Sequence, residues 1–505
     1  MSEPSGMSAT AEPAEPSQPS QPSEPRESSG WLRAPRGRRV ALALTVLAAF
    51  AGLAATGAVL DRNHDTGPDH PSTWDERVVP YVEIAERLRG LEFKHPVHVD
   101  FLAAKEFDKQ VTADDSDLTD EDREDMADIK DLMRSLDLVP ADLDLLEAAN
   151  TMGSSGVIGL YSFDDDRVRI NGTKLTPAVK STLVHELTHV LQDQHFGIGD
   201  HMDSFEDDTT GAGSAYSALV EGDASRIETK YAKSLSRADR KALRKEQNGE
   251  AEAAEEGMAE IPSVLQTLMG APYALGEALL DAAVVDADDD EANESVDDLF
   301  ANPPTTDEHL LDPWSLLASE DPADPVKTPG LASGEKSFDS GTFGALTWYL
   351  VLAARIPELA ALDAADGWGG DAYAAYRSGG ESCVSIDFVG DNPSDTEEMA
   401  RALRQWSAKG PAGAASVKAD ATTVHFRSCA AKAGRPVGST PDDVLSLPLT
   451  RTYITIGALE SGAPPLSARC AASGFIHRLP IDRLQGDFGE RPGDEAIRRE
   501  IWRSC

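Results

Sequence analysis

Residues 176–196 read TPAVKSTLVHELTHVLQDQHF and carry the start signal, the stop signal and the face pattern of a single helix. Thr176 offers a hydroxyl that can cap a helix, and Pro177 suits the first helical position. Gly197 follows the segment and is a typical residue at a helix end. The sequence therefore predicts a helix over residues 177–196.

The two faces of this helix differ in chemistry. At about 100° per residue, His189 lies about 40° from His185, so both imidazoles project from the same face. The apolar residues lie on the opposite face, between about 120° and 260° from His185, where they can enter a core. They are Val179, Leu183, Val184, Leu187, Val190 and Leu191.

His185-Glu186-Leu187-Thr188-His189 is an HExxH motif. Two histidines one helical turn apart suit tetrahedral Zn²⁺, and Glu186 can reach a zinc-activated water without coordinating the metal. We therefore expect His185 and His189 to be zinc ligands and Glu186 to be a general base. A third protein ligand is required.

Two residues compete for that third position. His195 completes the spacing HExxHxxQxxH, which is the metzincin pattern except that Gln192 stands where that family has glycine. Glutamine would be strained in the turn that brings the third histidine back, and on a continuous helix His195 lies about 100° from the middle of the ligand face. Glu221, within the stretch ALVEGDA (218–224) on an expected second helix, is the preferred ligand.

The Glu-Gly-x-Ala order after the HExxH helix resembles the gluzincins, in which a glutamate on the next helix completes the site. A wider resemblance over roughly residues 75–405 is to a poorly characterised group of bacterial, largely actinobacterial, gluzincin-type metallopeptidases. It implies an α+β, zincin-like fold that is mostly helical, with a small mixed sheet beside the HExxH helix. It also implies zinc bound by His185, His189 and Glu221. The matching stretches are GLY (159–161), RVRI (167–170), HELTHVLQDQHF (185–196), ALVEGDA, APY (271–273), NPPTT (302–306) and GWGGD (367–371).

The resemblance leaves several roles open. Gluzincins add a Tyr or His that stabilises the developing oxyanion, and four residues are available for this role. They are Tyr273, His309, Tyr349 and Tyr373. Asp193 and Asp223 are candidates for orienting the imidazoles. The strand around Arg167–Ile170 is the expected sheet edge for an extended peptide substrate, and Gly199–Ser214 is expected to be an inserted loop.

The N-terminal part of the sequence predicts a membrane anchor. Residues 1–30 are rich in Pro, Ser, Glu and Ala, which predicts a disordered cytoplasmic tail. Within residues 31–62, arginines precede the uncharged run Val40–Leu60, which is about 31 Å long as a helix and can span a bilayer. The positive-inside rule then places the rest of the chain outside the membrane, after a linker at residues 63–73. A cleaved signal peptide, which would give a secreted protein, is the alternative.

The remainder divides into an expected metallopeptidase domain at residues 74–408 and a cysteine-containing region at residues 409–505. The four cysteines are Cys383, Cys429, Cys470 and Cys505. Three pairings are possible in an oxidising compartment, and we prefer the sequential one, Cys383 with Cys429 and Cys470 with Cys505. The formal net charge of −42 argues against a nucleic-acid partner.

Local patterns predict further elements: a helix over Trp74–Arg89, a strand over His98–Leu102, a helix over Asp120–Leu136, and a hairpin of Val157–Tyr161 with Arg167–Ile170. Together these features predict zinc-dependent hydrolysis of peptide bonds outside the membrane. The alternative from another functional class is a non-catalytic, membrane-tethered binding module for an envelope partner. A hydrolase of another kind would need a nucleophile signature such as GxSxG, which the sequence lacks.

Overall fold

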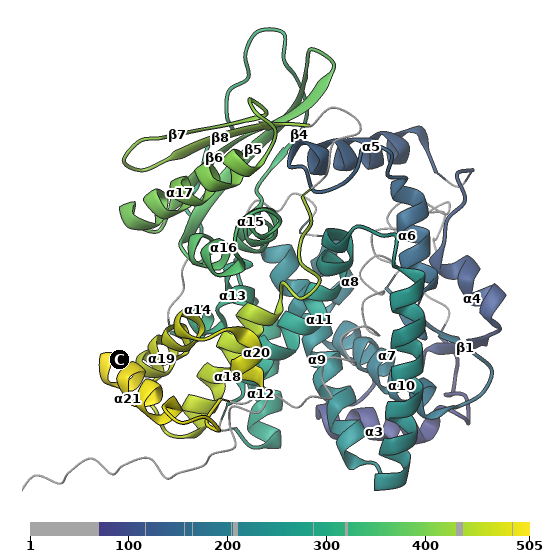
Figure 1. The fold of residues 1–505 in the computed structure, drawn as a ribbon. Helices are drawn as coiled ribbons and strands as arrows, with labels where there is room; N and C mark the ends of the chain where they lie inside the picture. Colours follow the sequence, from purple (N-terminus) through teal and green to yellow (C-terminus); the bar gives the residue numbers. More distant parts are fainter. Residues whose placement is uncertain are drawn as a thin grey trace, which may run out of the picture.

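The computed structural model describes residues 70–505 except 117, 156, 164, 204, 206–210, 286, 319–321, 431–437 and 487. The expected tail at residues 1–30 and the expected anchor at 31–62 lie outside the described residues. None of the helices described is long and apolar enough to cross a membrane. The described chain has the predicted α+β fold, mostly helical with two small sheets (Figure 1).

The first half of the chain surrounds the HExxH helix. Its elements are α3 (Val79–Arg89), β1 (His98–Leu102), α4 (Ala104–Val111), α5 (Asp120–Ser135), α6 (Leu145–Ser154), β2 (Gly159–Ser162), β3 (Arg167–Asn171), α7 (Pro177–Phe196), α8 (Ile198–Asp203), α9 (Ala212–Ser234) and α10 (Arg237–Gly257). The predicted β1 strand and the predicted hairpin are confirmed. The first helix begins five residues later than predicted, at Val79 with Pro80 in its first turn.

The sheet beside α7 is small and mixed, as predicted. Its strand order is β1-β3-β2, with β1 parallel and β2 antiparallel to β3. The prediction that Arg167–Ile170 forms the sheet edge is wrong, because β1 pairs with the second side of β3 and makes it the central strand. The edge strand nearest the HExxH helix is therefore β2, which contacts α7.

Helix α7 has the predicted bounds. The Thr176 hydroxyl accepts a hydrogen bond from the Val179 N–H, and Gly197 ends the helix in the left-handed conformation at φ 64°. The predicted apolar face is buried against the small sheet and α3. The opposite face, with both histidines, is also buried, because α9 packs across it.

The stretch Gly199–Ser214, which the sequence analysis assigns to a loop, is partly helical. Helix α8 occupies its first residues, and α9 already begins at Ala212. Ile198 of α8 is buried against Tyr216 and Leu219 of α9, so an apolar contact stabilises the short helix. Ile198 and the partly buried Phe205, which lie between α7 and α9, thus contribute to this apolar cluster.

Helix α11 (Ser263–Ala283) joins the two halves of the molecule. It contacts α9 on one side and the later helices α13, α14 and α18 on the other (Figure 1). The elements after it are α12 (Asp289–Ala301), α13 (Glu308–Leu311), α14 (Pro313–Ala318), β4 (Lys336–Gly341), α15 (Gly344–Ala353), α16 (Glu358–Ala365), β5 (Trp368–Ser378), β6 (Glu381–Gly390), α17 (Pro393–Lys409), β7 (Ala415–Ala419), β8 (Val424–Cys429), α18 (Ser446–Glu460), α19 (Pro465–Arg478), α20 (Ile481–Gln485) and α21 (Asp494–Ser504).

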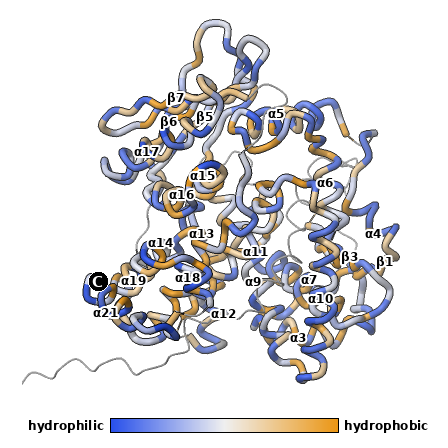
Figure 2. Tube along the Cα trace, viewed as in Figure 1, coloured by the Kyte–Doolittle hydropathy of each residue, from blue (hydrophilic) through white to orange (hydrophobic). Residues whose placement is uncertain are grey.

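An antiparallel sheet with the order β4-β5-β6-β8-β7 forms the second layer of β-structure. Helices α15 and α17 cover it with buried aromatic side chains: Trp348 contacts Phe388, and Trp406 contacts Phe426. Figure 2 shows hydrophobic residues concentrated in α15 and α16 and hydrophilic residues along α17's outer side. This sheet was not predicted from the sequence.

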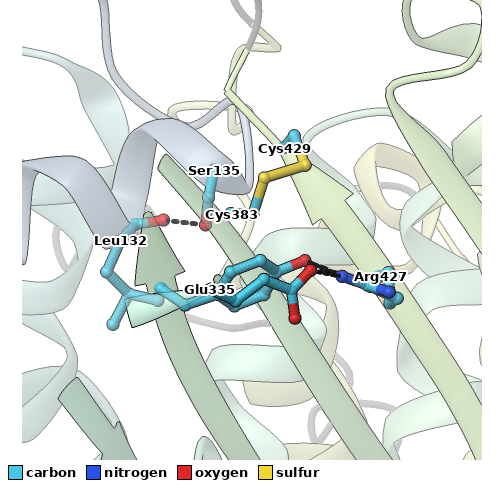
Figure 3. The surroundings of a disulfide bond; sticks show 7 residues. Leu132, Ser135, Glu335, Cys383, Arg427 and Cys429 are labelled. Atoms are coloured by element: carbon cyan, nitrogen blue, oxygen red, sulfur yellow. Dashed lines mark hydrogen bonds and ion pairs between the residues drawn. A yellow bond between two sulfur atoms is a disulfide. The ribbon is translucent and has the colours of Figure 1, made fainter. Parts of the chain in front are cut away.

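The predicted sequential disulfides are confirmed: Cys383 is bonded to Cys429, and Cys470 to Cys505. The first bond joins directly opposed residues of β6 and β8, next to Leu132 and Ser135 of α5 (Figure 3). The five-stranded sheet therefore crosses the boundary predicted at residues 408/409. Residues on both sides of that boundary share one hydrophobic core.

Candidate metal centre

Helices α7 and α9 bring three potential ligand atoms into one buried group. The Nε2 atoms of His185 and His189 lie 3.1 Å apart. Glu221 Oε2 lies 3.3 Å from His185 Nε2 and 3.4 Å from His189 Nε2. His185, His189 and Glu221 thus form the group of metal-ligating side chains found in the described part of the chain.

The spacing of these atoms fits a tetrahedral metal ion. Zn–N and Zn–O bonds of about 2.0–2.2 Å place the ligands of a tetrahedral zinc about 3.3–3.6 Å apart. Glu221 Oε2 is buried and accepts no hydrogen bond from the described residues, which leaves its lone pairs directed at the histidines. One ligand atom from each of the three side chains converges on the same buried point, so this group could bind a metal ion.

Burial and charge act against each other at these ligands. Burial alone would raise the pKa of Glu221, but the adjacent His189 and His185 outweigh it and lower this pKa to about 2. Burial alone would lower the pKa of His185, but its carboxylate neighbours Glu221 and Glu228 raise it. The carboxylate form of Glu221, which is the form that ligates metal, is therefore strongly favoured.

The Glu186 side chain extends from α7 toward the edge strand β2. A Cβ on Gly159 of β2 would lie 3.2 Å from Glu186 Cγ and 2.8 Å from Thr182 Cγ2, so only glycine allows this close approach. The backbone N–H of Tyr161 donates to the Glu186 carboxylate. Burial raises the pKa of Glu186, although His185 and His189 act in the opposite direction.

Gln192 holds the ring of His189. Its Oε1 lies 2.9 Å from His189 Nδ1, which leaves Nε2 of the same ring directed at Glu221. Its Nε2 donates to Asp223 Oδ2 and to the Val220 carbonyl, both at 3.0 Å. Gln192 therefore ties a ligand on α7 to the helix that supplies Glu221.

Asp223 accepts hydrogen bonds from two arginines as well as from Gln192. Arg89 of α3 donates to it at 2.7 Å, and Arg226 donates at 2.9 Å. Arg226 also donates to Asn293 of α12, and all of these side chains are buried. The predicted orienting role of Asp223 thus takes an indirect form, through Gln192 rather than through a histidine.

His185 has a carboxylate partner of its own. Glu228 Oε2 of α9 lies 3.4 Å from His185 Nδ1, and its other carboxylate oxygen accepts a hydrogen bond from Ser181 at 2.8 Å. Neither the contact of Glu228 with His185 nor the role of Gln192 was predicted from the sequence. Glu228 follows Glu221 by two helical turns, so its place on the same face of α9 was a usable signal.

His195 and Asp193 point away from the metal group. His195 Nε2 lies 2.8 Å from the Glu92 carbonyl, as expected for a helix that does not break at Gln192. Asp193 accepts hydrogen bonds from the Tyr161 hydroxyl at 2.9 Å and the Gly199 N–H at 3.2 Å. Asp193 therefore caps the helix end and does not orient the imidazoles.

Of the four candidate oxyanion residues, the structure brings Tyr273 to the site. Its ring stacks on His185 with centroids 6.3 Å apart and planes 25° apart. The other three make contacts elsewhere: Tyr349 donates to the Val444 carbonyl, Tyr373 donates to Asp339, and His309 bonds Ser315.

Comparison with known proteins adds one match. Residues 333–437 match the model of a family described as a domain of unknown function, DUF8575. The matched segment runs from β4 to β8 and includes the Cys383–Cys429 disulfide, but not His185, His189 or Glu221. No curated protein and no solved structure matches the chain.

Proposed function

We propose that this protein is a zinc metallopeptidase that hydrolyses peptide bonds, with Zn²⁺ held by His185, His189 and Glu221. The observation that carries the proposal is the 3.1–3.4 Å triangle of ligand atoms on two packed helices, with Glu186 one residue from the first ligand. Zinc would supply Lewis acidity, which makes water a nucleophile near neutral pH and polarises the substrate carbonyl.

Glu186 is the general base of the proposed reaction. It takes a proton from the attacking water and gives it to the amine that leaves. Its raised pKa suits this exchange, because a carboxyl group with an ordinary pKa is a poor acid near neutral pH. The Tyr161 N–H holds one carboxylate oxygen and so limits the orientations of the side chain.

Tyr273 is the candidate for stabilising the oxyanion that develops from the carbonyl oxygen. Its stacking on His185 places the phenol ring next to a metal ligand, and a phenol O–H can donate to a developing negative charge. Replacement by phenylalanine preserves the stacking and removes the donor. Tyr273→Phe should lower kcat by about 10²–10³-fold and leave zinc binding unchanged.

The edge strand β2 is the candidate for substrate pairing. Its outer side adjoins Glu186, and an extended peptide added there would run past the general base. The role predicted for Arg167–Ile170 of β3 thus passes to β2, because β2 is the edge strand that packs against α7. The substrate class is therefore an extended peptide segment bound mainly through its main chain.

The segment before residue 70 supports a position of the proposed peptidase outside the membrane. The run Val40–Leu60 and the arginines before it support a single-pass anchor with the body outside the membrane. The two disulfides suit an oxidising compartment. Both features support an extracytoplasmic metallopeptidase.

The test uses purified full-length protein loaded with zinc and incubated with a peptide library. We expect cleavage by the wild type, and loss of cleavage with zinc retained in Glu186→Gln. Glu76→Gln, on the surface before α3, is the matched control and should keep full activity. Zinc binding without cleavage in the wild type would contradict the peptidase and support the non-catalytic binding module.

A further inference from the structure

The first turns of α10 carry a concentration of positive charge that is unlike the rest of the chain. Residues 237–245 contain five Lys and Arg and one Asp, whereas the whole chain has 46 Lys and Arg against 88 Asp and Glu. The five basic side chains are exposed. They are Arg237, Arg240, Lys241, Arg244 and Lys245, and we call them the α10 basic face.

These side chains share one side of the helix. At about 100° per residue they span an arc of about 140°, and Asp239 lies roughly opposite the middle of that arc. Leu243 and Ala254 are buried and lie about 110–130° from the middle of that arc, so they attach a different side of α10 to the body. Ala251 is also buried and lies in line with the arc, but farther along the helix than the basic residues. Asp239 bonds Ser236 at the helix start, so it does not neutralise the basic face.

The arrangement works against the stability of the helix itself. Arg237 and Arg240 lie in the first turn, where the helix dipole disfavours positive charge, and the last turn has no basic residue. Three pairs four residues apart carry like charges, which repel each other on a helix surface: 237 with 241, 240 with 244, and 241 with 245. Within the described part of the chain, none of the five side chains has an ion pair or hydrogen bond that would offset this repulsion.

The geometry fits an extended anionic surface rather than a single small ion. Five exposed charges are spread over about 12 Å along a convex helix, whereas a bound phosphate would need donors that converge. Helix α10 begins close to α3, because Tyr231 near the end of α9 contacts Tyr81 of α3 (Figure 1). The basic face therefore lies near the start of the folded body.

The chain before residue 70 limits which anionic surface the α10 basic face can reach. If residues 40–60 span the membrane, residues 61–69 can reach at most about 30 Å, so the body stays close to the lipid headgroups. A body in a chain with a net charge of −42 would be repelled by anionic lipid at most orientations, and the α10 basic face offers the attractive one.

We propose that the α10 basic face docks the folded body onto anionic phospholipid headgroups and so fixes its orientation on the membrane. The docking uses the proposed anchor but not the metal centre. Its test therefore measures lipid contact and not peptide cleavage, and failure of the proposed peptidase activity would leave the result unaffected.

The experiment places a fluorescent probe on the basic face of the full-length protein. Asn248→Cys provides the attachment site, because Asn248 is exposed and lies one turn beyond Arg244 on the same side of α10. The protein is reconstituted in phosphatidylcholine vesicles with or without about 30% phosphatidylglycerol, and a nitroxide on the lipid headgroups quenches the probe on contact.

We expect strong quenching with phosphatidylglycerol, weak quenching with phosphatidylcholine alone, and loss of the difference in about 0.5 M salt. Arg240→Glu with Arg244→Glu should lower the ratio of docked to undocked bodies by about fivefold or more for each residue changed. Lys409→Glu with Lys418→Glu is the control, because it changes the net charge equally at exposed lysines of α17 and β7. This control should leave the quenching unchanged.

Four results would overturn the proposal. Equal quenching in both vesicle types would show that lipid charge does not matter, and equal effects of the two charge-reversal pairs would show that the α10 position does not matter. Loss of the quenching in millimolar inorganic phosphate at constant ionic strength would identify a phosphate-binding site instead. A probe signal that depends on protein concentration and not on lipid would identify a second copy of the chain as the partner.

Discussion

Gly222 of α9 and Gly276 of α11 lie in backbone contact. A Cβ on Gly222 would lie 2.4 Å from the carbonyl carbon of Gly276, and a Cβ on Gly276 would lie 1.9 Å from the Ala218 carbonyl oxygen. Gly222 directly follows Glu221, and Tyr273 lies one turn before Gly276. The contact of the two glycines therefore brings α11 close enough for Tyr273 to stack on the candidate metal ligand His185.

Gly276→Ala should destabilise the protein because the added methyl group would overlap the backbone of α9. We expect a loss of about 1–3 kcal/mol in the free energy of unfolding, measured by urea denaturation. Gly249→Ala is the control, since a Cβ at this position in α10 would meet nothing within 4 Å. That variant should stabilise by up to about 1 kcal/mol, because alanine is the better helix former. Equal effects of the two substitutions would contradict the close contact.

Glu221→Ala should abolish tight zinc binding, because it removes one of three converging ligand atoms. We expect the zinc dissociation constant, measured by competition with a chelator, to rise more than about 100-fold, since outer partners alone are worth 10–100-fold. His195→Ala should leave zinc affinity unchanged, because His195 contacts the Glu92 carbonyl. The reverse pattern would make His195 the third ligand and move the protein toward the metzincins.

Gln192→Met should weaken zinc binding by about 10–100-fold, because His189 loses the group that orients its ring. The apolar side chain also removes the donor to buried Asp223, so the free energy of unfolding is measured in parallel to separate the two effects. Gln194→Met on the same helix is the control. The Gln194 side chain contacts the loop at Lys94 and His95, so its loss should leave zinc affinity unchanged.

The parts of the site that the sequence predicts are those with local signals. The helix start at Thr176, its end at Gly197 and the one-turn spacing of His185 and His189 all lie within one segment, and the structure has them as predicted. The partners of Gln192 lie on other elements: Asp223 is on α9, and Arg89 is 134 residues away from Asp223. No periodicity in the sequence connects such residues, so the network could only come from the structure.

The order of strands in the two sheets could not be predicted from the sequence. The pattern around Arg167–Ile170 correctly indicated a strand, but the identity of the edge depended on which side of β3 received β1. The five-stranded sheet posed a similar problem, because β5 is buried along most of its length and does not alternate between polar and apolar residues. The cysteine pairing was easier, since opposed residues of β6 and β8 are also neighbours in the order of cysteines.

Glu250 of α10 should make the stability of the protein depend on pH. Burial, followed by the negative charges of Glu246 and Glu228, raises its pKa to about 7, and one of its oxygens accepts no hydrogen bond from the described residues. Below about pH 4.5 the carboxyl group is protonated in both the folded and the unfolded chain, so it costs nothing. As pH rises the unfolded chain releases the proton first, and stability falls until the folded protein also ionises at about pH 7.

Glu250→Gln should therefore change the free energy of unfolding little at pH 5 and raise it by about 1–2 kcal/mol at pH 8, after allowance for solvent screening. Urea denaturation at both pH values measures this, with Glu252→Gln at an exposed position of the same helix as the control. A stabilisation that is the same at both pH values, or that Glu252→Gln shares, would show that burial of Glu250 is not its cause.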